Sequence, residues 1–133
     1  MQLMDTADNR DFIPDGWHAI TPRIVAQDAK RLVGFLAQVF GATGDFQEAR
    51  PSTIRIDDSV VMVSEAGPRR AMPAFLYVYV RDCDATFRRA VELGAHAVEE
   101  PFDTPYGDRR CMVEDEWGNT WQVATQAKRR SAV

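Results

Sequence analysis

The sequence contains few of the residues from which metal and redox centres are built, with two cysteines and two histidines in 133 residues. Cys83 and Cys111 have no CxxC spacing and no accompanying histidine cluster, so neither a zinc site nor a redox pair is indicated. We expect both to be reduced packing thiols. His18 and His96 have no carboxylate at a telling spacing and are expected at the surface or the edge of the core. The sequence also lacks a phosphate-binding glycine-rich loop and a nucleophile elbow.

An excess of positive charge and long apolar runs are missing as well. Lys and Arg number 16 against 20 Asp and Glu, a net charge of -4, so nucleic acid is not an expected partner. No run approaches the ~20 apolar residues that span a bilayer, and Met1 to Asp15 is acidic where a signal peptide is basic and then apolar. We therefore expect a cytoplasmic protein with no membrane partner. Its hydrophobic content of 45% is enough for a single domain over residues 1–133.

The sequence does contain an internal repeat with a period of about fifty residues. The motif Val-Ala-Gln-Asp that ends at Asp28 is answered by Val-Arg-Asp, which ends at Asp82. Apolar residues at three- and four-residue spacing after Asp28 predict an amphipathic helix over residues 29–40, with Asp28 as its N-cap and Gly41 as its left-handed C-terminal residue. A second helix is predicted from Asp82 to Gly94, and a Gly-Ala pair follows each helix.

Downstream of each helix the pattern changes to that of strands joined by tight turns. Each half therefore predicts the order strand, helix, strand, strand, strand. The halves cover about residues 17–66 and 74–126, and residues 67–73, bounded by prolines, are the linker. The predicted turns are Asp57-Asp58, between strands 53–56 and 60–64, and 115–119, between strands 111–114 and 120–124.

Three segments of the chain carry a family resemblance: 21–25 (TPRIV), 80–87 (VRDCDATF), and 106–109 (YGDR) running into 113–119 (VEDEWGN). They resemble the vicinal-oxygen-chelate superfamily of glyoxalases, bleomycin-resistance proteins and dioxygenases, and most closely its metal-poor, PhnB-like branch. The resemblance implies an α+β fold of two tandem βαβββ modules, which form a cup-shaped mixed sheet with the helices outside and a ligand inside. Because this fold hosts lyases, isomerases, dioxygenases, transferases and drug-binding proteins, it does not decide the chemistry.

Alternation along the strands then sorts side chains between the helices and the cup. The expected helix-facing residues are Ile20, Pro22, Ile24, Val61, Val63, Leu76, Val78, Val80, Trp121 and Val123, and Val25 and Ala124 are among those expected to face the cup. The predicted ligand-binding residues are Thr21, Arg23, Met62, Ser64, Phe75, Tyr77, Tyr79, Met112, Trp117 and Gln122. For Trp117 two interpretations stay open: it covers the pocket as a lid, or it lies on a dimer surface.

The resemblance also locates the four ligand positions of the metal-bearing relatives. They fall at Thr21, Met62, Phe75 and Gln122, of which only Gln122 could bind a hard or borderline divalent ion. A register slip of one residue would bring in Glu65 without a second ligand beside it. We therefore expect no metal and no cofactor.

Tyr77, Tyr79 and Arg23 are predicted to share one pocket that prefers small aromatic or conjugated anions. The tyrosines offer stacking surface and phenolic hydrogen bonds, and Arg23 offers a bidentate contact to a carboxylate or enolate. The alternatives are that the tyrosines fill a collapsed cup and that Arg23 forms an ion pair with a nearby Asp or Glu.

Three functional hypotheses stay open on these residues. The first is a protein that binds a small organic, aromatic or anionic ligand in a metal-free cup shared across a homodimer. The second is a lyase or isomerase of the glyoxalase type, which uses an unrecognised metal or acid–base chemistry by Glu65, Glu114 or Tyr79. The third is a structural or regulatory dimer with a filled cup. Ligand identity, catalysis, dimer arrangement and the roles of residues 1–12 and the basic tail Lys128 to Val133 are not decided by the sequence.

Overall fold

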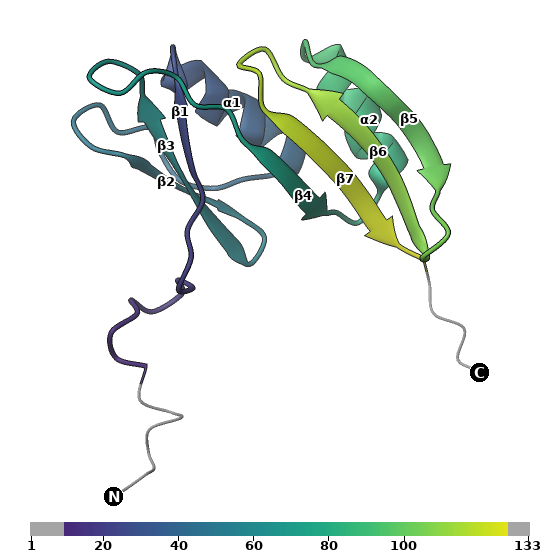
Figure 1. Ribbon diagram of the computed structural model, residues 1–133, viewed down its shortest axis with the longest axis horizontal. Coiled ribbons are helices and arrows are strands. Elements are labelled where there is room, and N and C mark those ends of the chain that lie inside the picture. Colours follow the sequence, from purple (N-terminus) through teal and green to yellow (C-terminus); the bar gives the residue numbers. More distant parts are fainter. Residues whose placement is uncertain (1–9, 128–133) are drawn as a thin grey trace, which may run out of the picture.

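The computed structural model describes residues 10–127, so the basic tail and residues 1–9 lie outside it. Each half of the chain contributes one helix and one sheet (Figure 1). The first half contains β1 (Arg23–Ala26), α1 (Ala29–Phe40), β2 (Ser52–Ile56) and β3 (Ser59–Glu65). The second half contains β4 (Phe75–Tyr79), α2 (Cys83–Glu92), β5 (His96–Asp103), β6 (Asp108–Glu114) and β7 (Thr120–Gln126). None of the described helices is long and apolar enough to cross a membrane.

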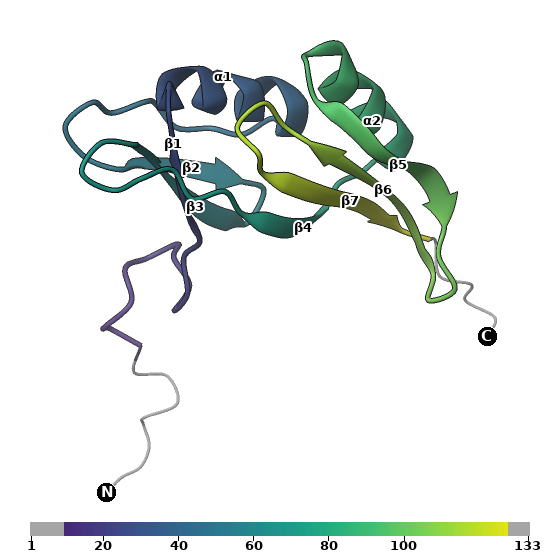
Figure 2. The same ribbon diagram turned by 45° about the horizontal axis from the view of Figure 1, so that its top comes forward.

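The strand order is β1-β3-β2 in the first sheet and β4-β7-β6-β5 in the second. β1 is parallel to β3 and β4 is parallel to β7, while all other pairs are antiparallel. Both helices lie on the same side of the curved sheets, which do not close on themselves (Figure 2). This arrangement confirms the predicted α+β fold of two similar modules with the helices outside.

The first module is less regular than the sequence predicts. The counterpart of β5 is reduced to a single bridge between Thr43 and Arg55, whose backbone groups exchange two hydrogen bonds of 3.0 and 2.9 Å. Gly44, the next residue, has φ +114, and a Cβ at this position would overlap the Thr53 carbonyl. The backbone therefore turns away after one bridged residue instead of continuing as a strand.

The two helices begin where predicted but are capped differently. Asp82 caps α2 with its own side chain, which accepts a hydrogen bond from the backbone N–H of Ala85 at 3.1 Å. Asp28 precedes α1 with φ 60 and makes no side-chain cap, so the predicted capping interaction is wrong for this residue. The Glu65 carboxylate takes its place, accepting from the N–H groups of Asp28 and Ala29 at 2.9 and 2.8 Å. α1 ends at Gly41 with φ 68, as predicted.

The core lies between the helices and the covered faces of both sheets. Predicted helix-facing residues Val61, Val63, Trp121 and Val123 are buried there, and the Phe40 ring of α1 packs 5.0 Å from the Trp121 ring. Leu76, Val78 and Val80 pack against the same cluster. Cys83 and Cys111 are buried and free, as predicted, and burial raises the pKa of both thiols, which makes them poor nucleophiles.

Around β1 the predicted side-chain direction of Ile20 is wrong, and Val25 is more buried than expected. Ile20 is 84% exposed because the strand begins only at Arg23, after Pro22, which cannot donate to a ladder. Val25 lies on the predicted face, outside the helix-side core cluster, but it is buried there beside Met72 of the linker, with which its backbone exchanges hydrogen bonds. The linker therefore covers the outer edge of β1 at this point.

Asp115 organises the turn between β6 and β7, and is itself only 4% exposed. Its carboxylate accepts from the backbone N–H groups of Trp117 and Asn119, both at 2.9 Å, and from the Asn119 side-chain amide. The same carboxylate accepts from the indole Nε1 of Trp121 at 2.9 Å. The Asn119 amide oxygen in turn accepts from the N–H of Ala74, one residue before β4. One buried carboxylate thus fixes the turn, the Trp121 side chain and the start of β4.

We expect Asp115→Asn to lower the free energy of unfolding by about 2–4 kcal/mol, because a neutral amide leaves buried donors without a charged acceptor. The measurement is urea denaturation followed by circular dichroism, with the midpoint shifting at constant slope. Glu114→Gln is the matched control, since Glu114 is the exposed neighbouring residue. Equal midpoints for the two variants would contradict the role assigned to Asp115.

Candidate functional site

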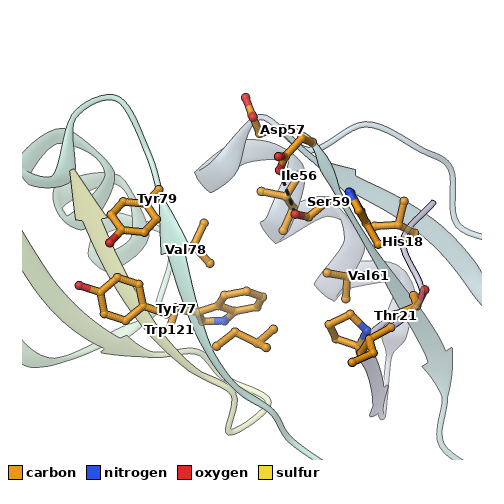
Figure 3. Close-up of a pocket in the computed structure, with 15 residues that line it drawn as sticks. His18, Thr21, Ile56, Asp57, Ser59, Val61, Tyr77, Val78, Tyr79 and Trp121 are labelled. Carbon is orange, nitrogen blue, oxygen red and sulfur yellow. Dashed lines mark hydrogen bonds between the residues drawn. The ribbon is translucent and has the colours of Figure 1, made fainter. Parts of the chain in front are cut away.

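A cavity of about 610 Å³ opens where the two sheets separate (Figure 3). Its walls come from the segment before β1, the hairpin of β2 and β3, and β4. In Figure 3, Val78 and Trp121 on one side face Val61 and Thr21 on the other. The residues that line it are His18, Ile20, Thr21, Pro22, Ile56, Asp57, Asp58, Ser59, Val60, Val61, Leu76, Tyr77, Val78, Tyr79 and Trp121.

The cavity combines apolar walls with an acidic edge. Six of the fifteen lining residues are valine, leucine or isoleucine from the two modules, and Pro22 and Trp121 add further apolar surface, as is usual in a small-molecule site. Asp57 and Asp58 form the tip of the β2–β3 hairpin, and Ser59 donates to Asp58 Oδ1 at 3.0 Å. His18 is exposed and also lies in the lining, which contains no lysine or arginine.

The helix-free face of the second sheet carries a row of aromatic side chains along β4. Phe75 is 66% exposed, Tyr79 is 59% exposed, and the rings of Tyr77 and Tyr79 lie 5.4 Å apart. Figure 3 shows both tyrosine rings on the opposite side of β4 from Val78 and Trp121. This alternation confirms that the tyrosines do not lie beneath a helix. Beside Tyr77, strand pairing places Gln122 of β7 and then Met112 of β6.

A chain of hydrogen bonds crosses this face and fixes the tyrosines. Arg110 Nη1 donates to the Tyr106 hydroxyl at 2.9 Å, and the Tyr106 and Tyr77 hydroxyls are 3.2 Å apart. Tyr77 and Tyr79 both donate to Asp108 Oδ2, at 2.6 and 2.8 Å. Because arginine only donates and a carboxylate only accepts, Tyr106 is the donor to Tyr77. Each hydrogen bond in the chain is therefore donated in the same direction, from Arg110 toward the buried Asp108.

This geometry raises the pKa of both tyrosines on β4. For Tyr77 the main cause is burial, followed by the hydrogen bond to Asp108, and for Tyr79 the hydrogen bond to Asp108 comes first. A phenolate beside the Asp108 carboxylate would add a second negative charge, so both hydroxyls are held in the neutral, donating form. Tyr79 is consequently a poor general acid in this arrangement.

The structure divides the predicted ligand-binding residues between the two modules. Arg23, Met62 and Ser64 lie together on the helix-free face of the first sheet, where Arg23 Nε donates to Ser64 Oγ at 3.0 Å. Among the described residues, no carboxylate forms an ion pair with Arg23. The cavity brings Thr21 together with Tyr77 and Tyr79, but its lining does not include Arg23. Within one chain, the predicted grouping of Arg23 with both tyrosines is therefore not formed.

Trp117 lies on the other side of the molecule from the aromatic row. Its ring packs edge-on to Phe35 of α1 at 5.8 Å, and the Arg31 guanidinium lies 4.7 Å above it. These residues line a second, smaller hollow of about 230 Å³ beside α1. In a single chain Trp117 thus contributes to helix packing and does not cover the cavity.

The side chains at the four mapped ligand positions do not fit a divalent metal. Thr21 and Met62 belong to the first module and Phe75 and Gln122 to the second, and a phenyl ring and a thioether are poor ligands for Zn²⁺, Fe²⁺ or Ni²⁺. Over residues 10–127, no three His, Cys, Asp or Glu side chains form a group that could hold a metal ion.

Sequence reasoning missed the residues that hold the aromatic row, namely Tyr106, Asp108 and Arg110. Asp108 and Arg110 share a strand face with Met112, which alternation from the predicted Met112 could have shown. Glu99, which accepts from Arg110 Nη2 at 3.0 Å, lies next to a register shift in β5 and could not have been placed by alternation.

Comparison with known families gives a match across most of the chain. The sequence model described as "Glyoxalase/Bleomycin resistance protein/Dioxygenase superfamily" matches residues 17–123. The uncharacterized protein Mb0911c of Mycobacterium bovis is 27% identical over 123 residues, covering 79% of this chain and 81% of that protein. The anthracycline biosynthesis protein DauV of Streptomyces sp. (strain C5) is 57% identical over 35 residues, which are 26% of this chain and 13% of DauV.

Solved structures with low sequence identity share the fold. TioX from Micromonospora sp. ML1 superposes with a TM-score of 0.70 at 24% identity, covering 80% of this chain and 97% of TioX. The fosfomycin resistance protein FosX from Listeria monocytogenes, complexed with Mn(II) and sulfate, has a TM-score of 0.66 at 12% identity, with coverages of 83% and 90%. At these identities the similarity concerns the fold alone.

We expect an alkaline absorbance titration to show Tyr77 and Tyr79 ionising above the ordinary tyrosine value of 10.0. Because the folded-state pKa is raised, the stabilisation from their bonds to Asp108 is complete below pH 10 and is lost as the pH rises further. Asp108→Asn should move both ionisations toward 10, since it removes the neighbouring negative charge. Asp45→Asn, at an exposed site, is the control, and identical titrations of the two variants would contradict the assignment.

Proposed function

The chain belongs to the glyoxalase/bleomycin resistance protein/dioxygenase superfamily, and from this premise we propose that it binds a small, partly aromatic organic molecule in a metal-free cup. Within the superfamily we propose the metal-poor, PhnB-like branch, because the mapped ligand positions carry Thr21, Met62 and Phe75. We also propose a cytoplasmic location and no nucleic-acid or membrane partner; the net charge of -4 leaves no positive field that would attract phosphate groups.

The observation that carries the proposal is the exposed aromatic row Phe75, Tyr77 and Tyr79. Large apolar side chains that gather on an exposed face commonly mark a site of interaction. The row is also rigid, because Asp108 holds both phenols before any ligand arrives, and a preorganised surface loses less entropy on binding. Gln122 and Met112 beside the row add an amide and an adaptable thioether.

The names of two relatives are consistent with small organic ligands. DauV is named for anthracycline biosynthesis and FosX for fosfomycin resistance. Arg23, on which an anionic preference was predicted, lies on the other module, so the aromatic part of the ligand is the better-supported part of the proposal.

An enzyme of the glyoxalase type has less support from the side chains considered for acid–base chemistry. The Glu65 carboxylate is engaged in capping α1. The Tyr79 hydroxyl donates a hydrogen bond to Asp108, and the pKa of Tyr79 is raised. Glu114 is exposed at the end of β6. None of the three combines a free proton-transfer group with an enclosed position.

We further propose that two chains form a homodimer that encloses the aromatic row. In one chain Phe75 and Tyr79 face outward on an open sheet, and a second copy is the simplest partner that would cover them. Such pairing could bring Arg23 of one module near the tyrosines of the other, which a single chain does not do.

We expect Tyr79→Ala to weaken binding of a planar aromatic probe such as 1-naphthol by about 2- to 10-fold, the effect of losing one aromatic contact of 0.5–1.5 kcal/mol. Calorimetry gives the affinity, and NMR shift mapping identifies the face. Tyr79→Phe keeps the ring and should bind almost normally, while Phe12→Ala removes an exposed aromatic outside the row. Loss of binding in Phe12→Ala, or absence of binding across a panel of such probes, would refute the proposal.

For the dimer, light scattering should give about 30 kDa, twice the chain mass of 15.0 kDa. Phe75→Glu, which places a charge in the row, should shift the protein toward the monomer, whereas Phe12→Glu should not. A wild-type protein that is monomeric at micromolar concentration would rule the dimer out.

A further inference from the structure

The cavity is bordered by a strand edge whose backbone groups are not paired. Thr120 N–H donates to the Ala74 carbonyl and Val80 N–H donates to the Ala124 carbonyl, both at 2.8 Å. In a parallel ladder the same alternate residues bond to the neighbouring strand, so Leu76 and Val78 bond to β7. The N–H and C=O groups of Phe75, Tyr77 and Tyr79 consequently point away from β7, toward the seam between the sheets.

The opposite side of the seam has the same character. Pro22 and Ala26 accept hydrogen bonds from Met62 and Ala66 at 2.9 Å, so the even-numbered residues of β1 bond to β3. Val25 points the other way and is paired with Met72 at one end of the seam. Within the described part of the chain, no hydrogen bond reaches the outward backbone groups of Tyr77 and Tyr79, at the other end. There the sheets separate and the cavity begins.

Apolar side chains surround this free edge on both sides of the cavity. Leu76 and Val78 lie on the helix side of the edge, and Ile56 and Val61 face them across the cavity. An extended chain lying beside β4 would place alternate side chains against these apolar residues. Asp57 and Asp58 at the hairpin tip would meet a positive charge on such a chain, because the lining contains no basic residue to neutralise them.

We propose that the free edge of β4 binds a short extended peptide with apolar residues and one basic residue, which adds to the second sheet as a further strand. This site shares Tyr77 and Tyr79 with the site in the proposed function but uses their backbone groups instead of their rings. The peptide is held by main-chain groups and apolar side chains within the seam, whereas the small aromatic ligand is held by rings on the helix-free face.

The test uses the full-length protein and the probe acetyl-Thr-Val-Lys-Val-Thr-amide, followed by NMR. In the free protein the amides of Tyr77 and Tyr79 should exchange with solvent faster than those of Leu76 and Val78, and the peptide should protect them. The first Val and Lys are adjacent, so their N–H groups point to opposite edges of an extended peptide. N-methylation of the residue whose N–H faces β4 should therefore weaken binding about tenfold more than N-methylation of the other. Tyr77→Pro removes one outward N–H and should also weaken binding about tenfold, while Tyr77→Phe keeps it.

The charge preference is tested with a peptide in which norleucine replaces Lys. Asp57→Asn combined with Asp58→Asn should weaken the Lys peptide about fivefold without affecting the norleucine peptide, and Asp45→Asn is the control. Absence of peptide binding, equal weakening by the two N-methyl groups, or protection confined to the even-numbered amides would overturn the inference. Because 1-naphthol binding is measured separately, that outcome would leave the proposed function intact, and the converse also holds.

Discussion

The carboxylate of Asp115 is the constraint from which the relative placement of the two modules follows. It accepts hydrogen bonds from the indole of Trp121 and from the turn that joins β6 to β7. Trp121 packs against Phe40 of α1, so the second sheet is oriented against the first helix. Through Asn119 the same turn holds Ala74 and thus the first residue of β4. The β4 wall of the seam is thus held through one buried carboxylate, whose two oxygens accept five hydrogen bonds.

β4 is the element that gives the molecule its two chemically different surfaces. On one side its leucine and valine side chains and its outward backbone groups line the seam, and on the other its aromatic rings are fastened to Asp108. The buried carboxylate of Asp108 therefore fixes aromatic side chains on the open face, as Asp115 fixes Trp121 in the interior. In both places, a negative charge surrounded by donors fixes aromatic side chains that could otherwise rotate. Rigid presentation of rings suits recognition better than proton transfer, which needs a group free to change its charge.

Local sequence signals predicted the local structure well. The start of the second helix at Asp82, the end of the first at Gly41, both hairpin turns and the helix-facing valines follow from spacing and alternation over a few residues. Features that depend on contacts between distant segments were not predicted: the capping of α1 by Glu65, the burial of Val25 by the linker, and the chain from Arg110 to Asp108. The register shifts in β5 also place Glu99 beside Arg110 in a way that no alternating pattern contains. Arg23 lies on the strand face that alternation predicted, with Met62 and Ser64. Its separation from the tyrosines depends on how the two modules pack, which alternation within one strand does not contain.

The difference in capping makes the first turn of α2 depend on local contacts and that of α1 on distant ones. The first turn of α2 obtains its acceptor from Asp82, three residues before the donor, so this cap needs no other element to be in place. The first turn of α1 obtains its acceptor from Glu65, 37 residues after Asp28, and that bond requires closure of a long loop and a completed β3. Two modules with the same order of elements therefore differ in the sequence separation of the contact that caps the helix. That separation is 37 residues for α1 and three for α2.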